Sequence, residues 1–382
     1  MKSIYLDNAA TTPLSGSMKE YLTSLLSVYG NPSSLHSVGG QAGRLIVQAR
    51  ASVAGFLNAS PEDVFFTCSG SAGNALAIKG LVSEKRADDR YEVFYSPTAH
   101  KSMLSACESC RRHTPLKVNA IGEINPFYLH DILQKHRPLR PLVCIEAASS
   151  ETGTIQDVAG IGSIVKRHNG LLLVDATGYL PSCPIDMRRW HSFVDMLTFS
   201  GHKLHALKGT GILWKRQNIR LTPLIYGTQE QGLIGGTENT LGIASLGKAA
   251  ADYDYTSITP HNRDYVYAYI VRHIPDCTLV GAPPDSGHRL PHHLYLCFRG
   301  VEGESLMLLL DMYGIQVSTG SACSQKSPAA SAALYAIGMN PQDMHSCIRL
   351  TFSGRETQEE LDYVCVKLKQ CVASLRNSET PE

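Results

Sequence analysis

Two side chains suited to cofactor chemistry, Asp175 and Lys203, each follow an apolar run of the kind that forms a buried strand. Asp175 ends the run Leu171–Asp175, and Lys203 comes three residues after the run Met196–Ser200. Ligands of open α/β sheets bind outside the carboxyl ends of the strands, so we expect both groups at one edge. Pyridoxal 5'-phosphate needs a carboxylate beside its ring nitrogen and an amine that forms a Schiff base. The pair therefore predicts a pyridoxal phosphate enzyme.

Small residues and a histidine accompany this pair at the predicted edge. Gly70 and Ser71 lie in a turn between a strand and a helix, where converging N–H groups bind phosphate. Ser200 and His202 add donors beside Lys203. His100 opens a helix after another strand, and its imidazole would stack on the pyridine ring and move protons. Helix caps remain the alternative role for Asp175 and His100, and a glycine-rich turn alone is a weak signal.

A small, polar segment that contains Cys323 lies between a predicted strand and helix of the C-terminal part. Little apolar surface holds the segment Ser318–Ser324 in place, so its thiol is available as a nucleophile. The cysteines in apolar strands, such as Cys144, should be inert. Arg355 follows a strand and could pair with a substrate carboxylate, although a surface arginine is the alternative.

Two further patterns have metal-like spacing, but we expect no metal site. Cys107 and Cys110 lie two residues apart inside a predicted helix and lack a second ligand pair. His292 and His293 open a predicted strand with alternating faces, so one histidine should point outward.

Composition narrows the class of protein. The chain has 382 residues, 43% of them apolar, and a net charge of +1, which predicts two packed domains and no nucleic-acid partner. No apolar run reaches about 18 residues, and no basic leader precedes Ile4, so we expect neither membrane association nor export. Eleven scattered cysteines in a long chain indicate reduced thiols and a cytoplasmic location.

Short β-branched runs alternate with helical patterns from about residue 18 to 250, which predicts an α/β domain with a mainly parallel sheet. The predicted strands of this part are 63–67, 92–96, 142–146, 171–175, 196–200 and 210–214. Its predicted helices include 18–29, 41–57, 74–85, 101–112 and 159–168. Beyond residue 255 the spacing changes, with strands at 294–298, 316–318 and 347–352 and helices at 304–312, 328–337 and 358–374. We expect a large domain of residues 15–255 and a smaller α+β domain of residues 1–14 and 256–382.

In combination, six motifs resemble those of the cysteine desulfurases, pyridoxal phosphate enzymes with the class V aminotransferase fold. The resemblance covers nearly the whole chain. The motifs are Tyr5–Pro13, Gly30–Ser34, Val174–Thr177, Ser200–Lys203, Gly236–Asn239 and Gly320–Cys323.

The resemblance assigns a role to each candidate residue and implies a homodimer of fold type I. Lys203 would hold the cofactor and deprotonate Cα, and Asp175 and Thr177 would lie at the ring. The phosphate site would include Thr237, contributed across the dimer interface. Arg355 would bind the carboxylate of L-cysteine, and Cys323 would take its sulfur as a persulfide for an acceptor protein, leaving alanine.

Several positions depart from the family's pattern around the cofactor. Gly178 stands where a glutamine usually follows Asp-Ala-Thr, and Ser149 and Ser150 stand where two asparagines precede Glu-Thr-Gly. Amides there help to set the pKa of the Schiff base, and Ser150 is expected to replace them in part. Ala72 and Ile234 replace a glutamate and an arginine.

The stretch from Arg349 to Arg355 is one residue longer than in the family, which leaves the register of Arg355 open. Three functions are therefore compared: a cysteine desulfurase, a pyridoxal phosphate lyase or aminotransferase acting on another small amino acid, and a scaffold protein without turnover. Retention of Asp175, Lys203, His100 and Cys323 favours the first.

Overall fold

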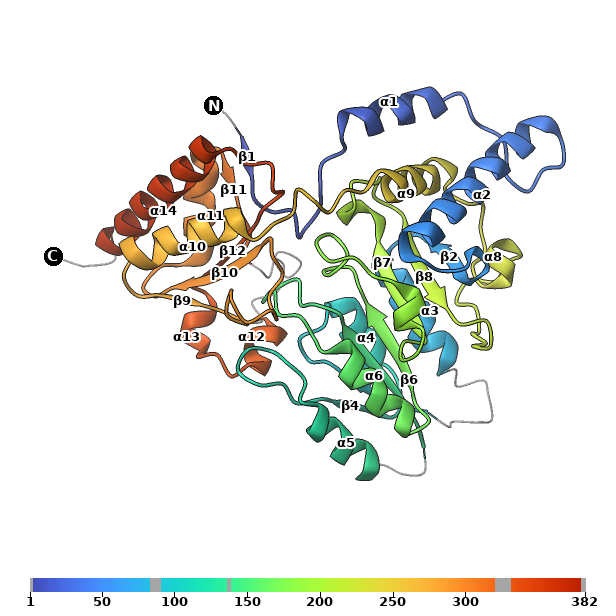
Figure 1. Cartoon of the computed structure of the whole chain (residues 1–382), viewed down its shortest axis with the longest axis horizontal. Helices are drawn as coiled ribbons and strands as arrows, with labels where there is room; N and C mark the ends of the chain where they lie inside the picture. The colour runs from blue at the N-terminus through green and yellow to red at the C-terminus, as the bar shows by residue number, and fades with distance from the viewer. Residues whose placement is uncertain (1–2, 83–90, 136–138, 320–330, 379–382) are drawn as a thin grey trace.

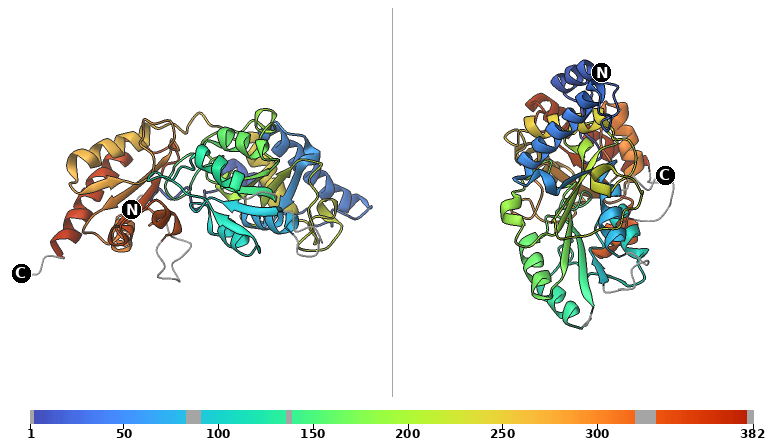
Figure 2. Two further views of the ribbon diagram at one scale, coloured as in Figure 1. Left: turned by 90° about the horizontal axis from the view of Figure 1, so that it is seen from below. Right: turned by 90° about the vertical axis from the view of Figure 1, so that its right-hand side faces the viewer.

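The chain forms two lobes, each built around its own β-sheet (Figure 1). The computed structural model describes residues 3–82, 91–135, 139–319 and 331–378, so Cys323 lies outside the described residues. A second view from below shows the lobes side by side, with both chain termini on the smaller one (Figure 2). Within the described ranges no helix combines the length and apolarity that crossing a bilayer requires.

The large lobe contains a seven-stranded, mainly parallel sheet, as predicted. In spatial order its strands are β2 (Val64–Thr67), β8 (Gly211–Lys215), β7 (Met196–Ser200), β6 (Leu171–Asp175), β5 (Arg140–Glu146), β3 (Tyr91–Tyr95) and β4 (His113–Pro115). Strand β8 is antiparallel to both of its neighbours, and the other pairs are parallel. The carboxyl ends of β3, β5, β6 and β7 therefore share one edge, where Asp175 and the segment after Ser200 lie.

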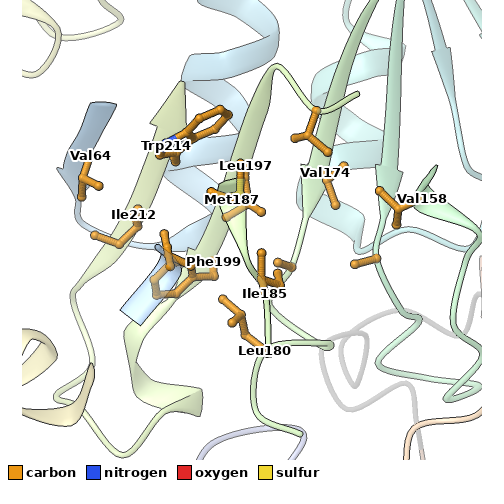
Figure 3. Packing of buried hydrophobic residues seen from close by; sticks show 14 of the residues in the cluster. Val64, Val158, Val174, Leu180, Ile185, Met187, Leu197, Phe199, Ile212 and Trp214 are labelled. Carbon is orange, nitrogen blue, oxygen red and sulfur yellow. The ribbon is translucent and has the colours of Figure 1, made fainter. Parts of the chain in front are cut away.

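Buried side chains alternate between the two faces of this sheet. Val174 and Leu197 belong to the cluster that includes α2, α6 and α9, part of which Figure 3 shows. Leu173 and Met196 belong to the cluster under α3 and α4. Because successive side chains of a strand point to opposite faces, Asp175 lies on the α3 and α4 side together with Leu173.

The helices of the large lobe pack on both faces of the sheet (Figure 1). They are α1 (Gly16–Leu25), α2 (Ser37–Leu57), α3 (Gly70–Leu81), α4 (Lys101–Glu108), α5 (Pro126–Lys135), α6 (Val158–Arg167), α7 (Met187–Trp190), α8 (Gln229–Gly232) and α9 (Thr240–Asp252), with 3-10 turns at η1 (Pro61–Asp63) and η2 (Gly201–Lys203).

Several predicted helix boundaries in this lobe were wrong: α1 ends at Leu25 rather than at residue 29, and α2 begins at Ser37 rather than at residue 41. Helix α3 begins at Gly70 rather than Asn74, because the Ser69 hydroxyl accepts a hydrogen bond from Ala72 N and caps the helix. Helix α4 ends at Glu108, so Cys110 lies beyond its end.

The smaller lobe combines an antiparallel sheet with a short parallel pair. The sheet has the order β12 (Cys347–Thr351), β10 (His293–Phe298), β9 (Cys277–Leu279), and β1 (Ile4–Tyr5) pairs with β11 (Ile315–Gln316). Its helices are α10 (His261–His273), α11 (Gly303–Met312), α12 (Ala332–Ala336), α13 (Pro341–Met344) and α14 (Gln358–Ser378). The chain's first strand thus lies in this lobe, while the domain boundaries stay a prediction.

The expectation that one of His292 and His293 points outward was wrong. His292 is 5% exposed and His293 is fully buried. Strand β10 is the central strand of its sheet, and both of its faces are covered, by the core of the smaller lobe on one side and by the segment around Ser150 on the other.

Gly211 on β8 lies so close to the backbone at the start of α3 that the packing leaves no room for a side chain. A Cβ at this position would lie 2.4 Å from Ser69 C and 2.6 Å from Gly70 N, which are backbone atoms. We expect Gly211→Ala to lower the free energy of unfolding by about 3 kcal/mol, as overpacking does. Gly55→Ala is the matched control, since a Cβ there meets open space inside α2 and should stabilise the protein by about 0.8 kcal/mol. Urea denaturation measures both, and a Gly211→Ala protein as stable as the wild type would contradict the packing argument.

Candidate active site

The Asp175 carboxylate is buried at the end of β6 and held by two donors. Its Oδ2 accepts a hydrogen bond from Asn74 Nδ2 at 2.8 Å, and its Oδ1 accepts one from Thr177 N at 2.9 Å. Thr198 on β7 donates in turn to Asn74 Oδ1 at 2.6 Å. The carboxylate therefore has a fixed orientation at the edge, with α3, β6 and β7 tied together around it.

Lys203 is the last residue of the 3-10 turn η2, which follows β7 directly. The N-terminal segment holds this turn: Thr12 N and Thr12 Oγ1 both donate to the carbonyl oxygen of His202, at 3.1 and 2.9 Å. The His202 Nδ1 atom lies 3.1 Å from Thr11 Oγ1. Desolvation, together with the neighbouring charges of Lys203 and Lys208, lowers the pKa of His202 to about 4, so this imidazole is neutral at pH 7.

The turn at the start of α3 closes against the end of β7. Gly70 N donates to Ser200 Oγ at 3.0 Å, and a Cβ on Gly70 would lie 2.6 Å from the same oxygen. Ser71 is exposed at this helix N-terminus. The structure thus brings together three of the residues predicted to bind phosphate, and only a residue without a side chain allows this approach at position 70.

His100 caps the N-terminus of α4 and lies near both Asp175 and Lys203. Its Nδ1 accepts a hydrogen bond from Ser102 N at 3.2 Å and lies 2.8 Å from Ser102 Oγ. The imidazole keeps a solvent-accessible edge, yet desolvation lowers its pKa, the charge of Asp175 raises it and that of Lys203 lowers it. Asp175 ends β6 and Lys203 follows β7, and because these two strands are parallel neighbours, both residues lie at the same edge of the sheet.

Two arginines of the smaller lobe have different surroundings. Arg355, the predicted substrate ligand, is exposed, and its charge acts on His205 and Tyr253. Arg349 on β12 is 5% exposed and donates to Ser150 O at 2.9 Å and to Asp7 Oδ1 at 2.8 Å. Its Nε has no partner among the described residues.

Arg349 also acts on His292, since its charge and that of Lys203 both help to lower the pKa of that imidazole, for which desolvation is the largest cause. Sequence reasoning missed it because β12 looks like a core strand. The available signal was a charged residue in an otherwise apolar strand.

Gly178 packs against the segment Ala148–Ser150. Gly178, Ser149 and Ser150 are the positions that were predicted to affect the pKa of the Schiff base. A Cβ on Gly178 would lie 2.8 Å from Ala148 O and 3.4 Å from Ser150 N. Ser150 is also held from the smaller lobe, because its carbonyl oxygen accepts from Arg349 and lies 3.2 Å from His293 Nε2. The two departures from the family's pattern therefore form one contact.

A cavity of about 250 Å³ lies beside the turn at the start of α3. It shares Cys68 and Ala72 with that turn, and its other walls include Ile225, Ile234 and the exposed Thr237. Ala72 and Ile234, the two positions without the family's charges, line the same cavity, which Glu230 and Glu238 line as well.

The cysteines do not form a metal site in the described part of the chain. All ten cysteines there are free thiols, and no cluster of three or more histidine, cysteine, aspartate or glutamate side chains could hold a metal ion in that part. Cys144, Cys297 and Cys347 are buried, whereas Cys68 is exposed.

The chain is similar to known proteins over nearly its whole length. The model of the class-V aminotransferase family matches residues 4–364. A cysteine desulfurase of Nostoc sp. is 35% identical, over 98% of this chain and 94% of its own. The cysteine desulfurase IscS of Dictyoglomus turgidum is 33% identical, over 98% of this chain and 96% of its own.

Solved structures agree with these matches. A NifS-like protein from Rickettsia africae superimposes with a TM-score of 0.87 at 27% identity, over 97% of this chain and 100% of its own. A structure described as SspA in complex with cysteine has a TM-score of 0.79 at 28% identity, over 93% and 100% of the two chains. The chain therefore belongs to the class-V aminotransferases and, within that class, to the cysteine desulfurase family.

Asn74 is the residue on which the orientation of Asp175 depends most directly. Asn74→Ala removes the donor of Asp175 Oδ2 and the acceptor of the Thr198 hydroxyl, both of them buried. We expect the free energy of unfolding to fall by about 2 kcal/mol, since a buried polar group left unpaired costs about 1 to 3 kcal/mol. The exposed Asn218→Ala is the control and should change it by less than about 0.5 kcal/mol. Equal stability of the two variants in urea would contradict the role given to Asn74.

Proposed function

We propose that this protein is a pyridoxal phosphate-dependent cysteine desulfurase, which converts L-cysteine to L-alanine and passes the sulfur through a persulfide on Cys323 to an acceptor protein. One observation carries the proposal: Asp175 ends β6 and Lys203 follows its parallel neighbour β7, so both lie at one edge of the sheet, and the charges of both act on His100. Similarity to proteins named as cysteine desulfurases supports the substrate.

The residues of this edge fit pyridoxal phosphate. Asp175 is a buried carboxylate with two fixed donors, which suits a protonated ring nitrogen. Gly70 and Ser71 begin α3, and Ser200 contacts Gly70 at this helix N-terminus, a place that favours a phosphate, while His202 follows Ser200 in η2. Thr177 and Ser150 would lie beside the ring. When bound, the cofactor supplies a covalent link to Lys203 and withdraws electrons from the substrate's Cα.

The chain's own residues would bind the substrate and move its protons. Lys203 would take the proton from the substrate's Cα, and His100 would stack on the ring and relay protons. The Cys323 thiolate would then attack the substrate sulfur, so that an S–S bond forms while the C–S bond breaks. The carbon that loses sulfur takes a proton and leaves as alanine.

We also propose a homodimer, in which Thr237 of each subunit contacts the cofactor phosphate that the other subunit binds. The exposed side chains of Leu224 and Ile225 border the cavity that Thr237 lines, so apolar surface gathers beside this residue. The acceptor is proposed to be a protein. The cytoplasmic location stays a prediction based on the many reduced cysteines.

Cys323→Ala tests the persulfide step. After incubation with L-cysteine, the wild-type protein should gain the mass of one sulfur and release alanine, while the variant gains none. Cys68→Ala is the control, because Cys68 is exposed but lies outside the proposed sulfur path. Formation of the persulfide should speed up as the pH rises toward about 8.5, since the thiolate is the nucleophile. Pyruvate and ammonia as products, without a mass gain, would identify a lyase instead.

Replacing each arginine separately tests which one binds the substrate carboxylate. Because Arg349 is buried and has an unpaired Nε, we expect Arg349→Ala to raise KM for L-cysteine at least about tenfold, the loss of one charge-assisted hydrogen bond. Arg355→Ala should leave KM within about twofold of the wild type. A large rise in KM for Arg355→Ala, with little change for Arg349→Ala, would instead favour Arg355, the residue predicted from the sequence. Far-ultraviolet circular dichroism controls for folding.

A further inference from the structure

A second carboxyl group, that of Glu146, lies beside Asp175. Glu146 ends β5, Asp175 ends β6, and the two residues are direct partners in the parallel register. Leu142 and Cys144 on β5 pack into the cluster under α3 and α4, as does Leu173 on β6. Because side chains alternate along a strand, both carboxyl groups point to the same face of the sheet.

The two carboxyl groups differ in how well their oxygens are hydrogen-bonded. Asp175 accepts hydrogen bonds from an amide and a backbone N–H, which suit an ionised group. Glu146 is 4% exposed, its Oε1 is hydrogen-bonded to the Thr98 hydroxyl, and its Oε2 has no partner within the described residues. An ionised carboxylate with an unpaired oxygen is costly to bury, and more so beside a second negative charge.

The groups around Glu146 act on its protonation in opposite directions. Desolvation, with a smaller contribution from the charge of Asp175, raises the pKa of Glu146 to about 7. Hydrogen bonds from Thr98, from Ser96 and from the backbone oppose this shift. Asp175 supplies the neighbouring charge from β6, while Thr98 and Ser96 face Glu146 from the segment after β3.

We propose that Glu146 and Asp175 form a carboxyl pair that shares one proton, held by Glu146, and that this proton sets the charge that Asp175 presents to the cofactor ring. While Glu146 is neutral, the edge carries one negative charge. When Glu146 ionises, a second negative charge lies beside the first and increases the proton affinity of any base that Asp175 faces. Glu146 is thus a positioning residue that acts through Asp175. The effect on the ring rests on the proposed function.

The shared proton can be measured in the protein without cofactor. The infrared C=O band of the protonated Glu146 carboxyl should disappear with a midpoint near pH 7 and be absent from Glu146→Gln. Asp175→Asn should lower this midpoint, because it removes the neighbouring negative charge. Asp63→Asn is the matched control: burial also raises the pKa of Asp63, but this residue lies in η1, away from the pair, so its loss should leave the midpoint unchanged.

Stability provides a second readout on the same protein. The pKa of Glu146 is higher in the folded state than its ordinary value of 4.5, so its contribution is most favourable below about pH 4.5 and is lost as the pH rises to about 7. Glu146→Gln should remove this loss and so be relatively more stable above the midpoint. A Glu146 carboxyl that is already ionised one pH unit below that midpoint would overturn the proposal of a carboxyl pair. A midpoint that Asp175→Asn leaves unchanged would overturn it as well.

The effect on the ring is measured with nitrogen-15-labelled pyridoxal phosphate bound to the wild-type protein and to Glu146→Gln. Above the midpoint, the ring nitrogen of the wild type should stay protonated to a higher pH than that of the variant, and identical titrations would overturn this part. A wild-type protein that binds no pyridoxal phosphate would instead overturn the proposed function, while the infrared band still decides whether Glu146 holds the proton.

Discussion

The hydrogen bond between Asn74 and Asp175 is the interaction on which the rest of the site depends. Asn74 belongs to α3, whose N-terminal turn closes on Ser200, while Asp175 and Thr198 belong to neighbouring strands. One amide therefore fixes the distance between the N-terminal turn of α3 and the end of β6. A buried carboxylate oxygen needs a donor, so α3 cannot move away from the sheet without leaving Asp175 Oδ2 unpaired. The smaller lobe is tied to the same edge through Arg349, which holds Ser150 and Asp7 together.

The departures from the family's pattern fall into two spatial pairs. Gly178 packs against Ala148–Ser150, so the loss of an amide at one position accompanies the loss of amides at its neighbour. Ala72 and Ile234 line one cavity, where two charges of opposite sign are absent together. The departures are therefore grouped in space rather than scattered over the lobe.

Much of the fold and part of the site could be predicted from the sequence. Leu171–Asp175 and Met196–Ser200 are strands with the predicted bounds. A short, nearly continuous apolar run is typical of a strand that is buried on both faces of a parallel sheet. Helix α9 was missed, since Gly242 and Gly247 lower its propensity and only packing explains them: a Cβ on Gly247 would lie 2.4 Å from Ala49 Cα. Arg349 and Glu146 were missed for a related reason. The role of a polar residue in an apolar strand depends on the side chains that it contacts, and these come from strands that are distant in sequence.

The central claim is that Asp175 and Lys203 act on a single ligand. The most direct measurement is to add pyridoxal phosphate to the protein, reduce with borohydride and map the labelled peptide. The account predicts one pyridoxyl group per chain on Lys203, and much weaker labelling in Asp175→Ala at limiting cofactor. Labelling spread over several surface lysines, or labelling of Lys203 that is unaffected by the loss of Asp175, would contradict it.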